Sequence, residues 1–208
     1  MYYERMYEPI YFQFGSYQTE IELLTSLFLD GENQPPRLKK ESDQGWTLNS
    51  LANSYSLIGQ PRRAVPVYQN AVLLAEKEEN KKNTAIGLGA MASTALLSIG
   101  ALRDAERNLR PQIDLSHEIE NEDTWARGCR ELGRVLSYRG AWQEADAIHD
   151  KGIELARKEG HKQLECVIMA YSAHRAYLMK NYPLSIEKGQ IAKKLADIPF
   201  SNLVACQA

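Results

Sequence analysis

The sequence contains few of the residues and motifs on which catalysis and metal binding usually depend. Its three cysteines and four histidines lie far apart, and none has the spacing of a metal site or of a redox-active CxxC motif. The sequence has neither a GxxxxGK[ST] nor a GxGxxG phosphate-binding loop, and neither an HExxH nor a GxSxG motif. These absences predict a non-catalytic chain that holds no metal ion and no other cofactor.

The odd number of widely spaced cysteines also argues against a disulfide framework. Cys129, Cys166 and Cys206 are therefore expected to be reduced thiols, as is usual in the cytoplasm. No apolar run approaches the roughly 18 residues that a membrane-spanning helix needs, and no basic leader precedes an apolar segment. We therefore expect a cytoplasmic protein without a membrane span or a signal peptide.

Strand signals and charge of a single sign are scarce as well. Val and Ile do not alternate with polar residues, and no Asn-Gly or Asp-Gly pair separates two alternating runs, so almost no β-structure is expected. Although 25% of the residues are charged, the net charge is only −2. This balance argues against general binding of nucleic acid or of an anionic membrane, and it leaves open a local basic patch.

What the sequence does contain is a repeated pair of amphipathic segments, clearest between residues 46 and 75. The apolar positions of the first segment, spaced as on one face of a helix, are Leu48, Leu51, Ala52 and Tyr55. Gly59 follows where a helix end can adopt a left-handed conformation, and Pro61 suits the start of a second helix. The apolar positions of that second helix are Ala64, Val67, Tyr68, Ala71, Val72 and Ala75.

The same register recurs along the chain, because Gly59, Gly100 and Gly140 stand at intervals of 41 and 40 residues. In the last repeat Lys180-Asn181 replaces the glycine, and Asn181 is expected in the left-handed conformation. The intervals predict one continuous domain, since no helical hairpin can bury its apolar face alone. Its parts are a leading degenerate hairpin at residues 1–30, four hairpins at 39–78, 84–120, 123–159 and 161–198, and a tail at 199–208.

Several local features are expected to depart from regular helix. Pro66 is predicted to cause a kink or a late helix start, and Pro111 a kink. The Gly- and Ala-rich segment at residues 85–100 is expected to be the weakest helix. The last helix is expected to pack through Leu184, Ile191 and Leu195. The aromatic-rich start, with Tyr2, Met6, Ile10 and Phe14 on one face, predicts an edge that faced an earlier repeat or that self-associates.

The spacing in the hairpin at 39–78 resembles the tetratricopeptide repeat (TPR), with a large residue, Leu, Gly/Ala and Tyr on one helix and Ala, aromatic, Ala on the next. Those places hold Leu48, Leu51, Ala52, Tyr55, Ala64, Tyr68 and Ala71. The resemblance implies an all-α, right-handed solenoid of TPR-like helical hairpins, with about four full units of about 40 residues and a leading partial one. It also implies a protein or peptide ligand in the concave groove that the first helices line.

The groove positions implied by this resemblance are Trp46, Asn49, Asn53, Arg127, Arg130, Arg134, Tyr138, His174 and Tyr177. The three arginines share one helical face without carboxylates among them, which predicts an acidic partner because guanidinium binds carboxylate bidentately. The alternatives are pairing with Glu131, Asp146 or Glu165, and plain solvation. His149, on the core side of its helix, is expected to be a structural histidine rather than a ligand.

A second resemblance covers most of the chain. Residues 11–71, KKNTAIGLGAMA at 81–92 and ELGRVLSYRGAW at 131–142 resemble the C-terminal TPR region of large bacterial signalling ATPases of the STAND type, which carry an NB-ARC or NACHT core. This resemblance implies a sensor or autoinhibitory arm, with the nucleotide site in a separate upstream domain. The favoured function is protein or peptide binding as a scaffold or sensor. The alternatives are a regulatory domain that senses a small ligand, and a structural module that forms homo-oligomers through its aromatic N-terminal unit.

Overall fold

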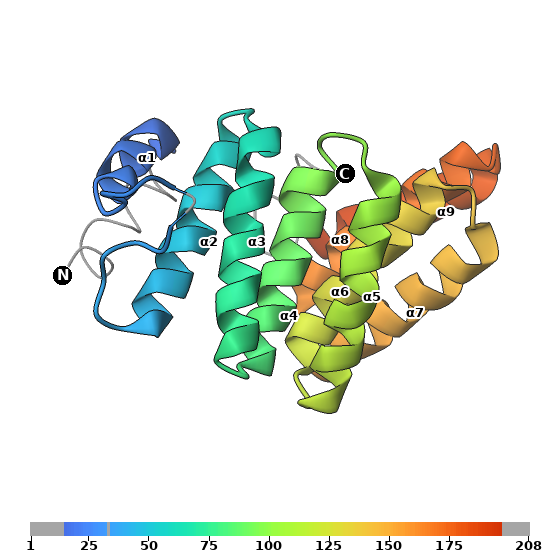
Figure 1. The fold of residues 1–208 in the computed structure, drawn as a ribbon. Helices are drawn as coiled ribbons and strands as arrows, with labels where there is room; N and C mark the ends of the chain where they lie inside the picture. Colours follow the sequence, from blue (N-terminus) through green and yellow to red (C-terminus); the bar gives the residue numbers. More distant parts are fainter. Residues whose placement is uncertain (1–14, 33, 197–208) are drawn as a thin grey trace. The chain divides into compact units, whose positions relative to one another are not determined.

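The computed structural model describes residues 15–32 and 34–196 of the 208-residue chain. Within those ranges the regular secondary structure is helical and includes no strand, which confirms the all-α class (Figure 1). The elements are α1 (Tyr17–Thr25), α2 (Glu41–Leu57), α3 (Pro61–Lys77), α4 (Lys81–Ala90), the π-helical segment η3 (Met91–Leu96), α5 (Leu102–Glu118), α6 (Glu122–Tyr138), α7 (Trp142–Lys158), α8 (Lys162–Leu178) and α9 (Tyr182–Ala196). The predictions for Tyr2, Met6, Ile10, Phe14, Cys206 and the tail lie outside the described residues.

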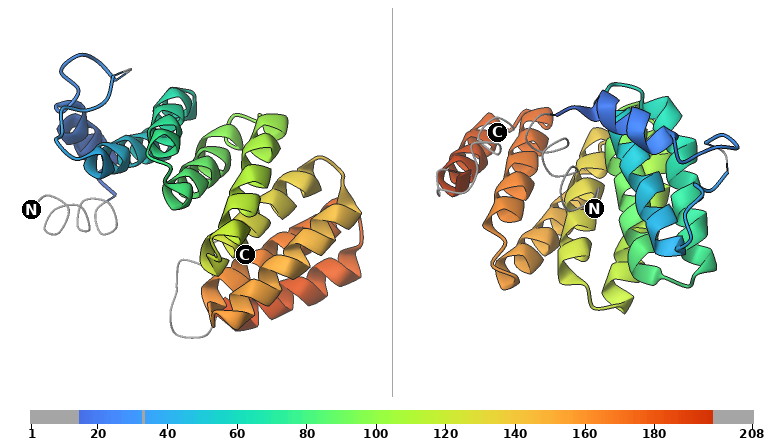
Figure 2. Two further views of the ribbon diagram at one scale, coloured as in Figure 1. Left: turned by 60° about the horizontal axis from the view of Figure 1, so that its bottom comes forward. Right: turned by 90° about the vertical axis from the view of Figure 1, so that its left-hand side faces the viewer.

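The chain forms two compact units, Met1–Ala101 and Leu102–Ala208. In the first unit α1 packs on α2, α2 on α3, and α3 on both α4 and η3. In the second unit each helix from α5 to α9 packs on the next, and α6 also contacts α8. Figure 2 shows the helices of each unit lying side by side, with α8 and α9 in orange to red. Helices that follow one another along the chain therefore form the packing layers of each unit.

Left-handed residues end the helices at the predicted places. Gly59, Gly100 and Gly140 have φ values of 82°, 74° and 78°. In the last hairpin, however, Lys180 takes this conformation with a φ of 61°, so the prediction for Asn181 is wrong. The side chain of Asn181 instead accepts a hydrogen bond from the backbone N–H of Leu184 at 3.3 Å. Because Asn181 is used to cap the start of α9, the strained conformation falls on its neighbour.

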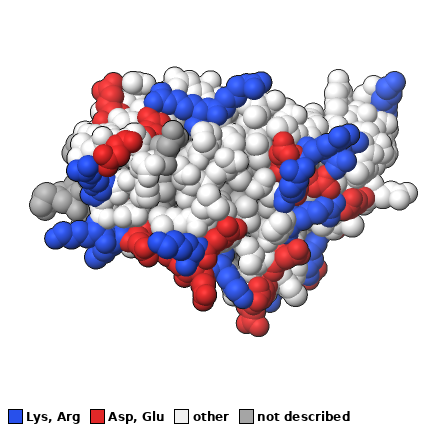
Figure 3. All heavy atoms as spheres, in the orientation of Figure 1, with Lys and Arg blue, Asp and Glu red and all other residues white. Residues whose placement is uncertain are grey.

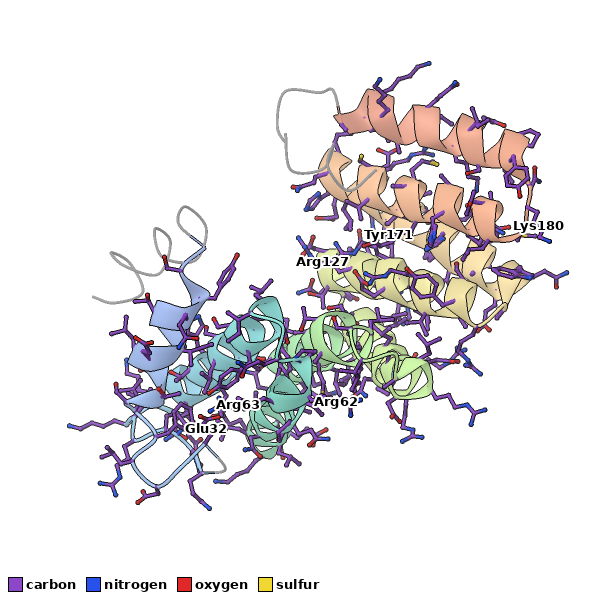
Figure 4. The ribbon with its side chains drawn as sticks, turned by 90° about the horizontal axis from the view of Figure 1, so that it is seen from above. Glu32, Arg62, Arg63, Arg127, Tyr171 and Lys180 are labelled. Carbon is purple, nitrogen blue, oxygen red and sulfur yellow. The ribbon has the colours of Figure 1, made fainter. Side chains whose placement is uncertain are left out.

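The opening hairpin is organised around two tyrosines, Tyr55 and Tyr68, both fully buried. The hydroxyl of Tyr55 donates to the Glu32 carboxylate at 2.7 Å. The Arg63 guanidinium donates to the same carboxylate at 2.7 Å, and Figure 4 labels Glu32 and Arg63. The Arg63 guanidinium carbon also lies 4.2 Å from the centre of the Tyr55 ring. These contacts tie the connection before α2 to the hairpin.

Two helices pass through their internal prolines. Pro66 lies inside α3, which begins at Pro61, so the expectation of a late helix start is wrong. Pro111 likewise lies inside α5. Pro66 is only five residues beyond the start of α3, close to the turn in which backbone N–H groups have no helical partner in any case. The missing N–H of this proline therefore interrupts little of the hydrogen-bond ladder.

The Gly- and Ala-rich segment is where regular α-helix gives way. After α4 the chain forms the π-helical segment η3, and the N–H of Leu97 bonds to the carbonyl of Ala92 at 3.0 Å, five residues back. The Thr94 hydroxyl within η3 donates to the carbonyl of Ala90 at 2.7 Å. The low helix propensity of this segment is therefore accompanied by a local change of helix type.

The core of the second unit includes a histidine packed on a glycine. His149 is fully buried, and its Nδ1 lies 3.2 Å from the Ser172 hydroxyl, which confirms its structural position. A side-chain carbon at Gly133 would overlap the imidazole ring of His149. Gly133 occupies the place of Ala52 in the repeat register. At this position the small residue leaves space for the imidazole ring of His149, in addition to allowing two helices to pack closely.

The last helix, α9, packs through smaller residues than the apolar pattern predicts. Ala192 and Ala196 are buried, whereas Ile191 is 37% exposed, so the inward assignment of Ile191 is wrong. The thiol of Cys166 on α8 donates to the carbonyl of Ala192 at 3.2 Å. Alanine at the contact lets the two backbones approach, and the longer isoleucine beside it is turned outward.

The surface carries charges of both signs. Figure 3 shows basic and acidic side chains next to one another at several places on one face. On α5, for example, Arg110 forms ion pairs with Glu106 at 2.6 Å and with Glu144 at 2.7 Å. None of the helices in the described ranges is both long enough and apolar enough to cross a membrane.

Candidate functional site

The predicted groove residues of the second unit lie on two helices that contact each other, α6 and α8. We call this surface the α6–α8 face and define it by Arg127, Arg130, Arg134, Tyr138, Tyr171, His174 and Tyr177. Two of the predicted residues meet directly, because the rings of Tyr138 and His174 are 5.8 Å apart in an edge-to-face arrangement. Figure 4 shows Arg127 and Tyr171 on these neighbouring helices. The register of the repeats thus brings residues of two hairpins onto one surface.

The arginines of this face have carboxylates of their own. Arg130 Nε donates to one oxygen of Glu131 at 2.7 Å, and Arg134 donates to the other at 3.2 Å. Glu131 is buried, with 5% of its surface exposed. The expectation that the cluster lacks built-in carboxylates is therefore wrong, and the alternative of pairing with Glu131 is the one observed. A buried carboxylate is stable only when paired and hydrogen-bonded, and the two guanidiniums supply both.

The remaining pairs leave one positive charge in excess. Arg127 donates to Asp123 at 2.8 Å, one turn earlier on α6. Asp146 and Glu165, the other two suggested partners, pair instead with Arg175 and with Arg157 and Lys162. The three arginines of the face are thus balanced by two carboxylates, Asp123 and Glu131. The face carries a weaker positive charge than three unpaired guanidiniums would.

Tyr171 is a residue of this face that the sequence interpretation missed. The guanidinium carbon of Arg134 lies 5.2 Å from the centre of the Tyr171 ring, and Arg134 donates to the Tyr171 hydroxyl at 3.2 Å. Burial and the nearby Glu131 carboxylate raise the pKa of Tyr171, so its hydroxyl stays protonated. Its spacing of three residues from His174 is a helical-face signal that could have identified it.

Exposed aromatic rings flank the arginines. Tyr138 is 44% exposed and Tyr177 is 58% exposed. The Tyr177 ring lies 5.8 Å from that of Tyr182, the first residue of α9. Tyrosine and arginine are enriched at protein interfaces, because they combine a large contact area with hydrogen bonding. The α6–α8 face therefore combines residue types that are common at protein interfaces.

The three predicted groove residues of the first unit have different environments. The Asn53 carbonyl oxygen accepts from the Tyr68 hydroxyl at 2.5 Å, and this hydroxyl also lies 2.8 Å from the Thr94 hydroxyl. Asn53 is therefore part of an internal network. Trp46 and Asn49 instead line a pocket of about 270 Å³ within this unit. Only these two remain together as a candidate binding site on α2.

Among the described residues, the potential metal ligands are dispersed and the cysteines are buried. Within 15–32 and 34–196, His, Cys, Asp and Glu side chains form no group of three that could hold a metal ion. Burial raises the pKa of the Cys129 thiol to about 12, so the reactive thiolate form is rare at neutral pH. The described cysteines, Cys129 and Cys166, are both buried and unpaired.

The successive antiparallel helix pairs place the chain in the class of helical-repeat proteins. The tetratricopeptide repeat model matches residues 47–82, from within α2 through α3 to the start of α4, and residues 129–163, from the middle of α6 through α7 to the start of α8. These two segments therefore match the tetratricopeptide repeat. No curated protein sequence matches the chain.

Solved structures show the same fold. A single-substitution variant of a putative kinesin light chain with nearly identical TPR-like repeats, from Podosopora anserina, has a TM-score of 0.70 at 17% identity and covers 88% of each chain. Another structure of those repeats has a TM-score of 0.68 at 17% identity, over 91% of this chain and 92% of that one. BtubC (BKLC) from P. vanneervenii gives 0.70 at 13% identity, over 91% and 77%. At these identities the likeness establishes the TPR-type solenoid fold alone.

Proposed function

We propose that the chain is a non-catalytic protein- or peptide-binding module, and that its ligand lies across the α6–α8 face. The observation that carries this proposal is the juxtaposition of Arg134 with Tyr171 and of Tyr138 with His174. These contacts hold cationic and aromatic side chains in fixed positions before a ligand arrives. Pre-organised side chains lose less conformational entropy on binding, which favours affinity. Tetratricopeptide repeats are in general protein-interaction modules, in agreement with this role.

The charge of the face favours a peptide that contributes a carboxylate. Asp123 and Glu131 leave one guanidinium charge uncompensated, and the side chain of Arg127 is 47% exposed. Arg127 uses its Nε for Asp123, and its Nη2 lies 3.3 Å from Nε2 of His161, so the N–H groups of its Nη1 can donate to a peptide carboxylate. Tyr138 and Tyr177 supply contact area for apolar residues on either side of that carboxylate. The proposed ligand is therefore an acidic peptide segment with neighbouring apolar side chains.

The proposal can be tested with a synthetic peptide array in which acidic, neutral and basic positions are varied systematically. Affinities of the best peptides would then be measured by fluorescence anisotropy with the full chain. We expect acidic peptides to bind, and Arg127→Ala or Tyr138→Ala to weaken binding about 5- to 30-fold, the effect of losing about 1–2 kcal/mol at an interface.

The matched control is Arg107→Ala, which removes a 79% exposed arginine from α5. It should bind as the unchanged protein does, because Arg107 is not part of the face. Binding of acidic peptides that is equal in the Arg127, Tyr138 and Arg107 variants would contradict the proposal. So would a preference for basic over acidic peptides on this face.

The resemblance to signalling ATPases adds a context to this proposal. In that context the module would serve as a sensor arm, and peptide capture would be its input. A phosphate-binding loop upstream in the same gene would support this role, and a gene that encodes no such domain would contradict it. Self-association through residues 1–30 is the structural alternative. It predicts concentration-dependent light scattering, and a mass that stays monomeric at all concentrations would oppose it.

A further inference from the structure

The start of α8 is capped by a histidine, whereas α4 and α6, the first helices of the two preceding hairpins, are capped by asparagine. The Asn80 and Asn121 side chains each accept a hydrogen bond at 3.0 Å from the backbone N–H three residues later. His161 takes the same place before α8, and its Nδ1 accepts from the backbone N–H of Leu164 at 3.2 Å. The three caps follow one another at intervals of 41 and 40 residues. Of these capping groups, only the imidazole is of a type that changes its charge near neutral pH.

The His161 ring lies against an arginine of the α6–α8 face. Its Nε2 is 3.3 Å from Nη2 of Arg127 and 3.8 Å from one oxygen of Asp123, whose other oxygen accepts from Arg127 Nε at 2.8 Å. Because the capping bond uses the lone pair of Nδ1, a neutral ring carries its proton on Nε2. Two donor nitrogens, Nε2 and Nη2, therefore face each other, and the Asp123 carboxylate lies beside both. The ring that caps α8 is thus part of the charge cluster around Arg127.

The other charged groups near this end of α8 do not contact the ring. Lys162 and Glu165 of α8 pair with each other. The charged residues at this end of the helices that pack on α8 are Glu122 of α6, Arg157, Lys158 and Glu159 of α7, and Lys193 and Lys194 of α9. Among the described residues, the charged groups in contact with the His161 ring are Asp123 and Arg127 alone. Its charge state therefore acts first on Arg127.

Protonation of His161 would change the electrostatics at Arg127. The added proton would go to Nδ1 and cost the capping bond, equally in the free and in the ligand-bound protein. It would also place a second cation beside Arg127. A ligand carboxylate at Arg127 would offset this charge, so the bound protein takes up the proton more readily than the free one. By linkage, the affinity for such a ligand then rises as the pH falls.

We infer that His161 makes acidic-peptide binding at Arg127 depend on pH, with tighter binding in mild acid. The inference rests on the proposed function of the α6–α8 face and adds its regulation. From pH 7.5 to pH 6.0 the affinity should rise about 2- to 5-fold, the effect of one charge pair near a protein surface. Side-chain carboxylates of the peptide ionise near about pH 4, so the peptide keeps its charge over this range.

The test uses fluorescence anisotropy with the full chain at pH 7.5 and pH 6.0 and at one low ionic strength. The probe is the acidic peptide that binds most tightly in the synthetic array, labelled with tetramethylrhodamine. Its neutral counterpart has Gln and Asn in place of Glu and Asp. The acidic peptide should gain affinity at pH 6.0, and the neutral counterpart should not. The gain should shrink at high salt, because screening weakens the interaction between charges.

The variant that isolates the titrating group is His161→Asn. Asparagine caps α4 and α6 in the same register, and it has no proton to gain in this range. The variant should keep its helix content by circular dichroism and lose the gain in affinity at pH 6.0. His117→Asn is the control, because it removes an exposed histidine of α5 that is not part of the face. It should keep both the affinity and the gain.

The second histidine of the face is tested by His174→Asn. His174 lies 13 residues further along α8, about 20 Å at 1.5 Å per residue. Screening is largely complete beyond about 10 Å, so this imidazole has little effect on a carboxylate at Arg127. The ratio of the affinities at the two pH values should therefore persist in this variant.

Equal affinities of the unchanged protein at the two pH values would overturn the inference and leave the proposed function in place. A gain that persists in His161→Asn, or one of equal size with the neutral peptide, would do the same. If no acidic peptide binds at either pH, the proposed function fails and this inference fails with it.

Discussion

The guanidinium of Arg175 on α8 is buried against the carboxylate of Asp146 on α7. Arg175 is only 2% exposed, which is rare for an arginine. A second guanidinium nitrogen donates to the sulfur of Met179 at 3.2 Å, and Lys188 of α9 lies 3.8 Å from the same carboxylate. Asp146 thus compensates two cations contributed by two other helices.

Replacement of Asp146 should therefore be unusually damaging. Asp146→Ala would leave the buried Arg175 charge without its counterion, and we expect a loss of about 3 kcal/mol in the free energy of unfolding. Urea denaturation followed by circular dichroism would measure it. Asp150→Ala, one turn further along α7 at an exposed position, is the control and should change stability by less than about 0.5 kcal/mol. Equal effects in the two variants would show that the buried pair adds nothing.

The stability of the protein should fall in mild acid because of His149. Burial and the Arg175 cation lower the pKa of His149 from 6.5 to about 4. The unfolded chain therefore binds this proton more readily, and stability is lost as the pH falls from 6.5 towards 4. Between about pH 7.5 and pH 5.0 the loss from this residue should be about 2 kcal/mol. Denaturation of His149→Gln at both pH values should show a pH dependence smaller by that amount.

The exposed His174 provides the control for the pH experiment. His174→Gln makes the same substitution at an exposed position, so it separates the loss of the buried imidazole from the introduction of glutamine. If the His149 and His174 variants lose stability in parallel with the unchanged protein, protonation of His149 is not linked to unfolding.

Two glycines in helices should respond oppositely to alanine. In Gly133→Ala the new methyl group would overlap the His149 ring, and we expect a loss of about 1–3 kcal/mol from overpacking. Gly189 lies in α9 with nothing within 4 Å of such a methyl group. Gly189→Ala should therefore stabilise the protein by up to about 1 kcal/mol through helix propensity. Thermal unfolding curves would show shifts in opposite directions, and a shared direction would contradict the packing argument.

The Glu131 carboxylate should control how strongly the α6–α8 face attracts acidic ligands. Glu131→Gln would free Arg130 and Arg134 from their counterion, so acidic peptides should bind about tenfold more tightly and with a steeper salt dependence. Stability should fall by about 2 kcal/mol, because hydrogen bonds to a charged group are lost. Glu154→Gln removes an exposed carboxylate from α7 and should alter neither property. Unchanged peptide affinity in the Glu131 variant would mean that the arginines do not meet the ligand.

The features that depend on local periodicity could be predicted from the sequence. Helical spacing alone predicted the buried stripes that include Tyr55 and Tyr68, and it also predicted the left-handed glycines. Both features depend on residues only a few positions away in the sequence. The same register placed Tyr138 and His174 on one surface. The preference of asparagine for the left-handed conformation gave the wrong residue in the last hairpin. Lys180 takes that conformation, because Asn181 caps the start of α9.

The burial of charged side chains could not be predicted in the same way. Glu131 and Arg175 look like ordinary surface residues in a charged helix, yet both are buried. Arg175 is stabilised there by Asp146, 29 residues earlier in the chain, and such a partner leaves no periodic signal. The pocket beside Trp46 depends on the distances between three helices, which no spacing rule contains.

The π-helical segment η3 explains why the repeat interval is not constant. The segment from the first residue of α4 to Gly100 is one residue longer than the segment from the first residue of α6 to Gly140. The 41-residue interval from Gly59 to Gly100 exceeds the 40-residue interval from Gly100 to Gly140 by the same single residue. A π-turn accommodates an extra residue without displacing the helix beyond it. The segment therefore has the form of an insertion that evolution absorbed inside a helix rather than in a loop. By this reasoning, alignments of the repeats should place their gap within Met91–Leu96.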